Sequence, residues 1–174
     1  MRVKVLYTFL KFLLILTISS CSRQAPQVVE VKSLPLDDLA GVVTQANGVS
    51  LDKGVSSDGK GSLKITANGP MVIKLFETGD IDLENARLIY QAKLRTENVQ
   101  GQVYLEMLCN FPGKGEFFSR GIETPLSGTM NWSIQEIPFF LKKGENPDNV
   151  KLNLVVNGKG TAWIDDVRLL KGNL

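Results

Sequence analysis

The sequence has no histidine and only two cysteines, Cys21 and Cys109. Histidine is the commonest general base and the commonest transition-metal ligand in proteins. Its absence therefore excludes a Ser-His-Asp triad, a Cys-His dyad and a zinc site built from histidine. Aromatic residues are also few, at 7% of the chain. A binding surface that relies on aromatic stacking has few side chains to use.

The body of the chain has no excess of positive charge. The formal net charge of the 174 residues is +2, but Arg2, Lys4 and Lys11 all lie in the first twenty residues, which contain no acidic residue. The remainder carries 17 basic and 18 acidic side chains. Because proteins bind nucleic acid through clustered Lys and Arg, we do not expect a nucleic-acid partner.

The first twenty residues have the layout of an export signal. A basic start is followed by an apolar stretch over residues 12–18 and by two small residues, Ser19 and Ser20. The apolar stretch is too short for a membrane-spanning helix, which needs roughly 20 apolar residues. We therefore predict a signal peptide over residues 1–20.

The run Leu16-Thr17-Ile18-Ser19-Ser20-Cys21 resembles the lipobox of bacterial lipoproteins, in which an aliphatic residue and two small residues precede an acylated cysteine. The resemblance implies that Cys21 becomes a lipidated N-terminus carrying acyl chains such as palmitate. Two or three chains would anchor the protein on a membrane, since each buried methylene contributes about 0.8 kcal/mol. Ser22 follows the cysteine, and the sorting habit of these lipoproteins then favours the outer membrane. The alternative is an ordinary secretory signal with a chance cysteine.

Acylation of Cys21 would leave Cys109 as the only thiol, without a partner for an intramolecular disulfide. The fold must then be held by its hydrophobic core, and a domain of about 150 residues buries close to 70% of its unfolded surface. Cys109 occupies an apolar position in an alternating run, and we predict that it is a small buried hydrophobe.

Turn residues recur about every eight to twelve residues, and short runs of alternating polarity lie between them. Alternation with period two is typical of a strand with one buried face. Such runs cover residues 86–95, 102–111 and 150–156, with shorter candidates over 62–66, 71–76, 117–120, 131–141 and 162–170. The pattern predicts an all-β sandwich or barrel over residues 36–174, joined to Cys21 by a polar tether over residues 21–35. Pro138 lies inside one run and places that strand at an edge or a bulge.

Three stretches stand out within these runs: the turn and strand Asp58 to Ile65, the strand from Trp132 to Phe140, and the closing segment Gly158 to Val167. Together they resemble the galactose-binding-like jelly rolls that include many carbohydrate-binding modules. The resemblance spans about residues 36–171 and implies a jelly-roll β-sandwich. It is weakly specific for any ligand, because related jelly rolls also serve as adhesion, assembly and structural domains.

Asp165 lies in the closing segment, where every second side chain over residues 163–169 is otherwise apolar. A carboxylate that faces the interior needs hydrogen-bond donors or a cation. The resemblance implies a structural Ca²⁺ between Asp165 and the turn at Asp58, held by Asp165 and by backbone carbonyls around Asp58 to Gly61, with Asp37 or Asp38 as further candidate ligands. The alternative is that Asp165 accepts hydrogen bonds from backbone N–H groups.

Jelly rolls of this kind bind sugars on the concave face of one sheet or in the loops at one end. The outward positions place Gln91, Lys93, Tyr104, Glu106 and Asn110 on neighbouring strands of one sheet, with Phe118 or Arg120 adjacent. Amides and carboxylates hydrogen-bond sugar hydroxyls, and an aromatic ring stacks on the C–H surface of a pyranose. The predicted carbohydrate-binding site consists of Gln91, Tyr104, Glu106, Asn110 and Phe118. A solvated strand face with an incidental tyrosine is the alternative.

The sequence therefore predicts a non-catalytic lipoprotein of the bacterial envelope whose jelly roll binds carbohydrate or a glycan-bearing partner. The alternative is a structural or assembly lipoprotein that docks another envelope protein. A glycosidase would need two facing carboxylates. Glu106 and Glu136 would form such a pair only if their strands were neighbours, and nothing in their local sequence distinguishes them, so we do not expect an enzyme.

Overall fold

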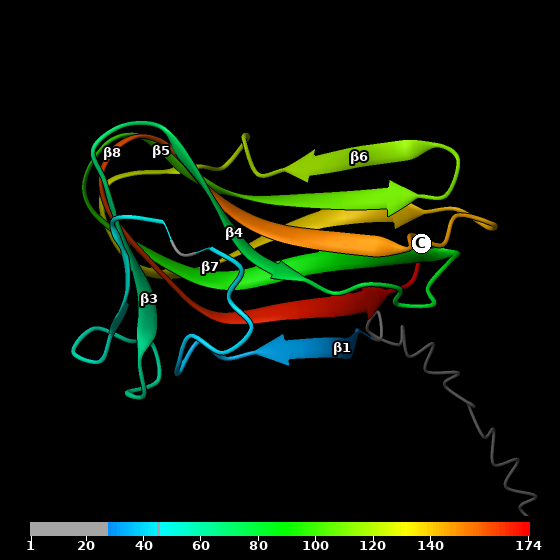
Figure 1. Cartoon of the computed structure of the whole chain (residues 1–174), viewed down its shortest axis with the longest axis horizontal. Coiled ribbons are helices and arrows are strands. Elements are labelled where there is room, and N and C mark those ends of the chain that lie inside the picture. The colour runs from blue at the N-terminus through cyan, green and yellow to red at the C-terminus, as the bar shows by residue number, and fades with distance from the viewer. Residues whose placement is uncertain (1–27, 45) are drawn as a thin grey trace, which may run out of the picture.

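The computed structural model describes residues 28–44 and 46–174. The predicted signal peptide and the predicted lipidation of Cys21 lie outside these residues. The described part is built from eight strands, which Figure 1 shows along the chain. They are β1 (Val29–Leu34), β2 (Val49–Asp52), β3 (Ser62–Ala67), β4 (Met71–Glu77), β5 (Ala86–Phe111), β6 (Gly115–Arg120), β7 (Leu126–Leu141) and β8 (Asn149–Gly172). No helix that could cross a membrane occurs among the described residues.

The long strands β5 and β8 pair with each other in antiparallel fashion and bend together halfway along their length. At the bend Gly101 lies opposite Gly158. A Cβ atom on Gly101 would lie 2.1 Å from the Asn157 carbonyl oxygen, and one on Gly158 would lie 2.1 Å from the Gln100 carbonyl oxygen. The two backbones can approach this closely only because both residues are glycine.

The bend divides each long strand between two sheets. One sheet, here called the β6 sheet, has the order β4, residues 149–157 of β8, residues 101–111 of β5, and β6. In the other sheet, here called the β7 sheet, residues 86–97 of β5 lie between β7 and residues 161–172 of β8. The strands β1 and β3 pair with the free edge of this part of β8, and β2 pairs with β3.

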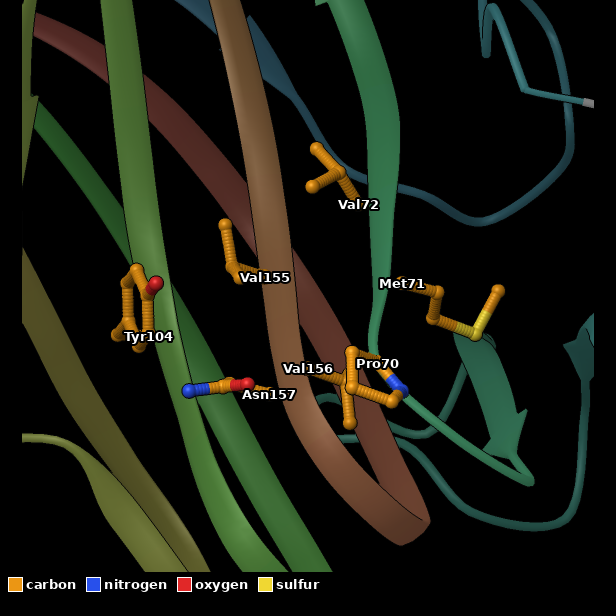
Figure 2. A pocket seen from close by; sticks show the side chains of 7 residues that line it. All are labelled: Pro70, Met71, Val72, Tyr104, Val155, Val156 and Asn157. Atoms are coloured by element: carbon orange, nitrogen blue, oxygen red, sulfur yellow. The ribbon is translucent and has the colours of Figure 1, made fainter.

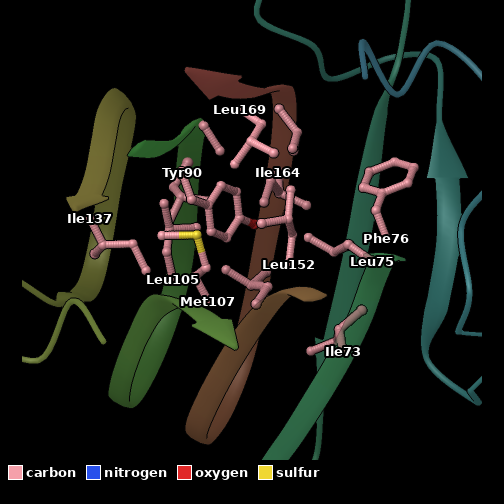
Figure 3. Packing of buried hydrophobic residues seen from close by; sticks show 14 of the residues in the cluster. Ile73, Leu75, Phe76, Tyr90, Leu105, Met107, Ile137, Leu152, Ile164 and Leu169 are labelled. Atoms are coloured by element: carbon pink, nitrogen blue, oxygen red, sulfur yellow. The ribbon is translucent and has the colours of Figure 1, made fainter. Parts of the chain in front are cut away.

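The core lies between the inner faces of the two sheets (Figure 3). Tyr90 comes from the β7 sheet, whereas Leu105 and Met107 come from the β6 sheet, and all three are almost completely buried in one cluster. Leu152 and Leu169 of β8 join the same cluster from the two sides of the bend. This packing confirms the predicted all-β sandwich, because two sheets enclose one core and the long strands β5 and β8 each contribute residues to both sheets.

Three local features can be compared with the sequence predictions. Cys109 is fully buried, as predicted, and burial raises the pKa of its thiol to about 12, with a smaller contribution from Glu116. In the described part of the chain β7 pairs only with β5, so the strand that contains Pro138 is an edge strand, as predicted.

The prediction of a tether over residues 21–35 is wrong for Val29–Leu34, because these residues form β1 and pair with β8. The alternation of Val29, Glu30, Val31 and Lys32 is typical of a strand, but the run is short and lies between Pro26 and Pro35, which favoured a tether.

Candidate functional site

The outer face of the β6 sheet is the surface formed by side chains that alternate with the core residues of its four strands. Cross-strand register aligns these side chains in rows. The central row crosses the sheet through Arg120, Glu106, Asn153 and Lys74, and the rows on either side are Tyr104, Val155 and Val72, and Phe118, Leu108, Lys151 and Glu77.

Glu106 is the centre of a hydrogen-bonded group on this face. One of its oxygens accepts a hydrogen bond from Arg120 Nε, and the other accepts one from Asn153 Nδ2 at 2.9 Å. Although Glu106 points away from the core, its neighbours leave it only 5% exposed. The Oδ1 atom of Asn153 is buried without a hydrogen-bond partner. The group therefore holds an ordered carboxylate and retains an unused amide acceptor.

Arg120 covers Glu106 and remains accessible from solvent, with 41% of its side chain exposed. The guanidinium carbon lies 4.3 Å from the centroid of the Phe118 ring. A guanidinium in contact with an aromatic face is attracted by the ring quadrupole. Phe118 therefore orients Arg120 while exposing much of its own ring at the edge of the face.

A hollow of about 400 Å³ opens beside the central row. Tyr104 of β5, Val155 and Asn157 of β8, and Val72 of β4 line it, as Figure 2 shows. Pro70, Met71 and Val156 complete the lining. The hollow thus combines an aromatic ring, an apolar ledge and one amide, which is the composition expected of a small-molecule site.

A further ion pair lies at the opposite side of the face from the hollow. Lys151 Nζ lies 2.7 Å from Glu116 Oε2. The hydrogen bond to Glu116 raises the pKa of the Lys151 amine. With Glu106 bound to Arg120 and Glu116 bound to Lys151, both of these carboxylates are neutralised by an adjacent cation.

Four of the five predicted binding residues lie on this face. Tyr104, Glu106 and Asn110 alternate outward along β5, and Phe118 pairs with Leu108 in the next strand. Asn110 donates a hydrogen bond to Asp148 Oδ1 at 2.7 Å, so its amide group is partly engaged within the protein. The predicted alternation of residues 102–111 is therefore confirmed.

The placement of Gln91 on the same sheet as Tyr104 is wrong. Gln91 precedes the bend of β5, so it lies on the outer face of the β7 sheet, where its amide donates a hydrogen bond to Glu136 at 3.1 Å. The core separates this face from that of Tyr104. The same geometry separates Glu106 from Glu136, which lie on opposite outer faces and do not form a facing pair of carboxylates.

Asn153 completes the site and was not among the predicted residues, whereas Arg120 was predicted as an alternative to Phe118 next to it. Alternation in residues 150–156 places Asn153 on an outward face, so this part of the signal was present in the sequence. Its contact with Glu106 joins residues 47 positions apart and depends on the register between β5 and β8. No local pattern specifies that register.

The predicted alternation across Asp165 is broken by an irregularity. Trp163 is buried outside the core cluster, between Lys64 and Arg95, and its Nε1 atom donates to Asp52 at 2.9 Å. The pairing of β8 with β5 shifts register between Trp163 and Arg168, and Asp166 has a φ of 49°. The core residues of this part of β8 are therefore Ala162 and Ile164 before the irregularity, and Val167 and Leu169 after it.

Asp165 is 1% exposed, which confirms the predicted burial of a carboxylate. Its two oxygens accept hydrogen bonds from the backbone N–H groups of Ser57, at 2.7 Å, and Asp166, at 2.8 Å. The Asp58 carboxylate accepts the backbone N–H of Lys60 at 2.9 Å instead of pointing to Asp165. Among the described residues no three acidic or cysteine side chains converge as metal ligands. This donor set does not fit the implied Ca²⁺, which prefers six to eight free oxygen ligands.

The fold and this face define a β-sandwich domain with a mixed aromatic and polar surface on one sheet. Comparison with solved structures finds the same fold in carbohydrate-binding modules. The CBM22-1 xylan-binding domain of Paenibacillus barcinonensis Xyn10C has a TM-score of 0.60 at 14% identity, over 87% of this chain and 99% of that domain. A family 16 carbohydrate-binding module has a TM-score of 0.54 at 12% identity, over 75% of this chain and 91% of that one. TmCBM61, solved in complex with β-1,4-galactotriose, has a TM-score of 0.50 at 16% identity, over 74% of this chain and 85% of that one.

At these identities the likeness shows the fold alone. No family model matches the sequence, and no curated protein matches it.

Proposed function

We propose that this protein is a non-catalytic, carbohydrate-binding lipoprotein of the bacterial envelope. The outer face of the β6 sheet binds the glycan, and Cys21 carries the lipid that holds the domain at a membrane, with the outer membrane favoured by Ser22. The lipid anchor rests on the lipobox resemblance of residues 16–21.

The observation that carries the glycan-binding proposal is the hollow at Tyr104 beside the polar row of Glu106. A sugar ring has an apolar C–H face and a rim of hydroxyl groups, so it needs an aromatic or apolar platform next to hydrogen-bonding groups. Tyr104 and Val155 supply the platform, and the exposed guanidinium of Arg120 supplies donors. The fold likeness to modules named for xylan and crystallised with galactotriose supports this assignment.

The charge pattern of the face favours an uncharged glycan. The carboxylates of Glu106 and Glu116 are each neutralised by an adjacent cation, Arg120 and Lys151 respectively. A charged sugar would have to compete with these pairs, whereas a hydroxyl can hydrogen-bond to them without breaking them.

A glycan array on the full chain, followed by calorimetric titration of the best oligosaccharide, tests the proposal. Tyr104→Ala removes the platform and is expected to lower the affinity roughly tenfold, with little change in melting temperature because Tyr104 is outside the core. Phe140→Ala is the matched control, since Phe140 is an exposed aromatic residue on β7 of the other sheet. This variant is expected to bind like the wild type.

Equal affinity of the wild type and Tyr104→Ala for the best oligosaccharide would contradict the proposed site. The absence of any glycan hit, together with retention of another envelope protein on the intact face, would favour the alternative of an assembly lipoprotein. A large fall in the melting temperature of Tyr104→Ala would instead show that the ring supports the fold.

A further inference from the structure

Three segments far apart in the sequence meet at the irregularity of β8, in what we call the strap junction. They are the strap over residues 35–38 after β1, the loop over residues 53–61 between β2 and β3, and residues 165–166 of β8. Ser57 of the loop donates its N–H to Asp165 of β8, and Asp166 donates its N–H to the carbonyl of Pro35 at 3.4 Å. The junction therefore ties the N-terminal strap to the last strand of the domain.

Lys53 connects the strap and the loop directly. Its Nζ atom donates hydrogen bonds to the backbone carbonyl oxygens of Asp37 and Lys60, the latter at 3.0 Å. Gly61 lies next to this contact, and a Cβ atom at this position would be 3.3 Å from Lys53 Nζ and 3.4 Å from the Asp37 carbonyl oxygen. Glycine at this position leaves room for the ammonium group between the two carbonyls.

Lys53 is the cation that the two carbonyl groups face. The oxygens of Asp37 and Lys60 both accept hydrogen bonds from its ammonium. Lys60 lies farther out, at 3.4 Å from Asp58 and 3.9 Å from Asp37, with 66% of its side chain exposed. Lys53 is also exposed, but it is the lysine whose ammonium lies between the two carbonyls.

The strap contains a strained backbone conformation, which other contacts must stabilise. Leu36 has a φ of 64°, in the left-handed region that costs free energy for a residue with a branched side chain, and yet it is only 3% exposed. The carbonyls on either side of Leu36 are those of Pro35 and Asp37. The N–H of Asp166 donates to the Pro35 carbonyl, and the ammonium of Lys53 donates to the Asp37 carbonyl. These two hydrogen bonds fix the turn that buries Leu36.

We infer that the Lys53 ammonium is the resident cation of the strap junction and takes the place that a calcium ion would hold in the jelly rolls that this sequence resembles. The Lys60 carbonyl lies in the turn where the resemblance implies calcium ligands, and here it accepts a hydrogen bond from the side chain of Lys53. The domain then keeps its fold without a divalent ion. This inference is independent of the proposed glycan binding.

Thermal unfolding of the full chain in the presence of calcium or of EDTA tests the inference. The wild type is expected to give the same melting temperature in both, because no divalent ion contributes. Lys53→Met removes the charge and its donors while keeping the aliphatic stem, and is expected to lower the melting temperature by about 2–4 °C or more. Lys60→Met is the matched control from the same loop and is expected to leave the melting temperature nearly unchanged.

A rise in the wild-type melting temperature with calcium, reversed by EDTA, would overturn the inference. Equal shifts for the two lysine variants would overturn it as well, because Lys53 would then contribute no more than a solvated surface charge. If Lys53→Met does not fold, Lys53→Arg keeps the charge and Lys53→Gln removes it. Greater stability of the arginine variant supports the inference, and equal stability of the two contradicts it.

Discussion

At the scale of single residues, polar groups removed from solvent form hydrogen bonds with residues from distant parts of the chain. Trp163 Nε1 donates to Asp52, which lies 111 positions earlier, and the indole ring lies between Lys64 and Arg95, each 5.5 Å from its centroid. The hydrogen bond from Trp163 lowers the pKa of the Asp52 carboxyl, and the backbone N–H groups of Gly54 and Val55 lower it further against the opposing effect of desolvation. The indole is therefore a structural feature of the β7 sheet rather than part of the candidate binding face.

This lowered pKa predicts a pH dependence of stability. The pKa of Asp52 is lower in the folded state than its ordinary value of 3.8, so its contribution is fully present above that value and is lost as the pH falls towards the folded pKa. Asp52→Asn should be less stable than the wild type at neutral pH, and the difference in unfolding free energy should shrink as the pH falls below 3.8. Chemical denaturation of both proteins along a pH series measures this difference. A difference that stays constant with pH would show that Asp52 ionisation contributes nothing.

At the scale of elements, the bend in β5 and β8 decides which side chains share a surface. The bend requires Gly101, whose φ is 126° and whose missing Cβ would collide with the Asn157 carbonyl oxygen. Before the bend β5 contributes Gln91 to one outer face, and after it β5 contributes Tyr104 to the other. The bend thus places outward side chains of one strand on the two opposite outer faces of the sandwich.

The variant Gly101→Ala tests whether the bend requires a glycine at this position, and Gly113→Ala is its control. Both glycines have a positive φ, but Gly113, in the turn between β5 and β6, has no atom within 4 Å of an added Cβ. Gly113→Ala should therefore cost only the conformational strain, about 1–2 kcal/mol. Gly101→Ala should cost at least twice as much, because a backbone oxygen must also move. Equal losses of unfolding free energy in urea would show that the close approach of β5 and β8 at the bend is not needed.

At the scale of the whole molecule, the proposed function depends on a membrane anchor that lies outside the described residues. If Cys21 is acylated, Cys21→Ser should move the protein from the membrane fraction to the soluble fraction of the envelope. Cys109→Ser is the control, since Cys109 is buried in the core and this variant should stay with the membrane. Fractionation with intact-mass analysis gives the readout. Membrane association without an added acyl mass in the wild type would exclude this anchor.

Local alternation in the sequence was enough to predict an all-β sandwich and the orientation of individual side chains. It placed Leu105, Met107 and Cys109 in the core and Tyr104, Glu106 and Asn110 on the outer face, because the side-chain period of a strand depends only on the strand itself. The strand β1 was predicted as part of the tether although Val29 to Lys32 alternate, because this run is short and lies between two prolines.

Only the tertiary structure decided which outward side chains meet. The contact of Asn153 with Glu106, the separation of Gln91 from Tyr104, and the position of Lys53 between two carbonyls all depend on strand register, on a bend at paired glycines and on loop packing. These are set by the joint packing of segments tens of residues apart, and a pattern with a period of two residues carries no information about them.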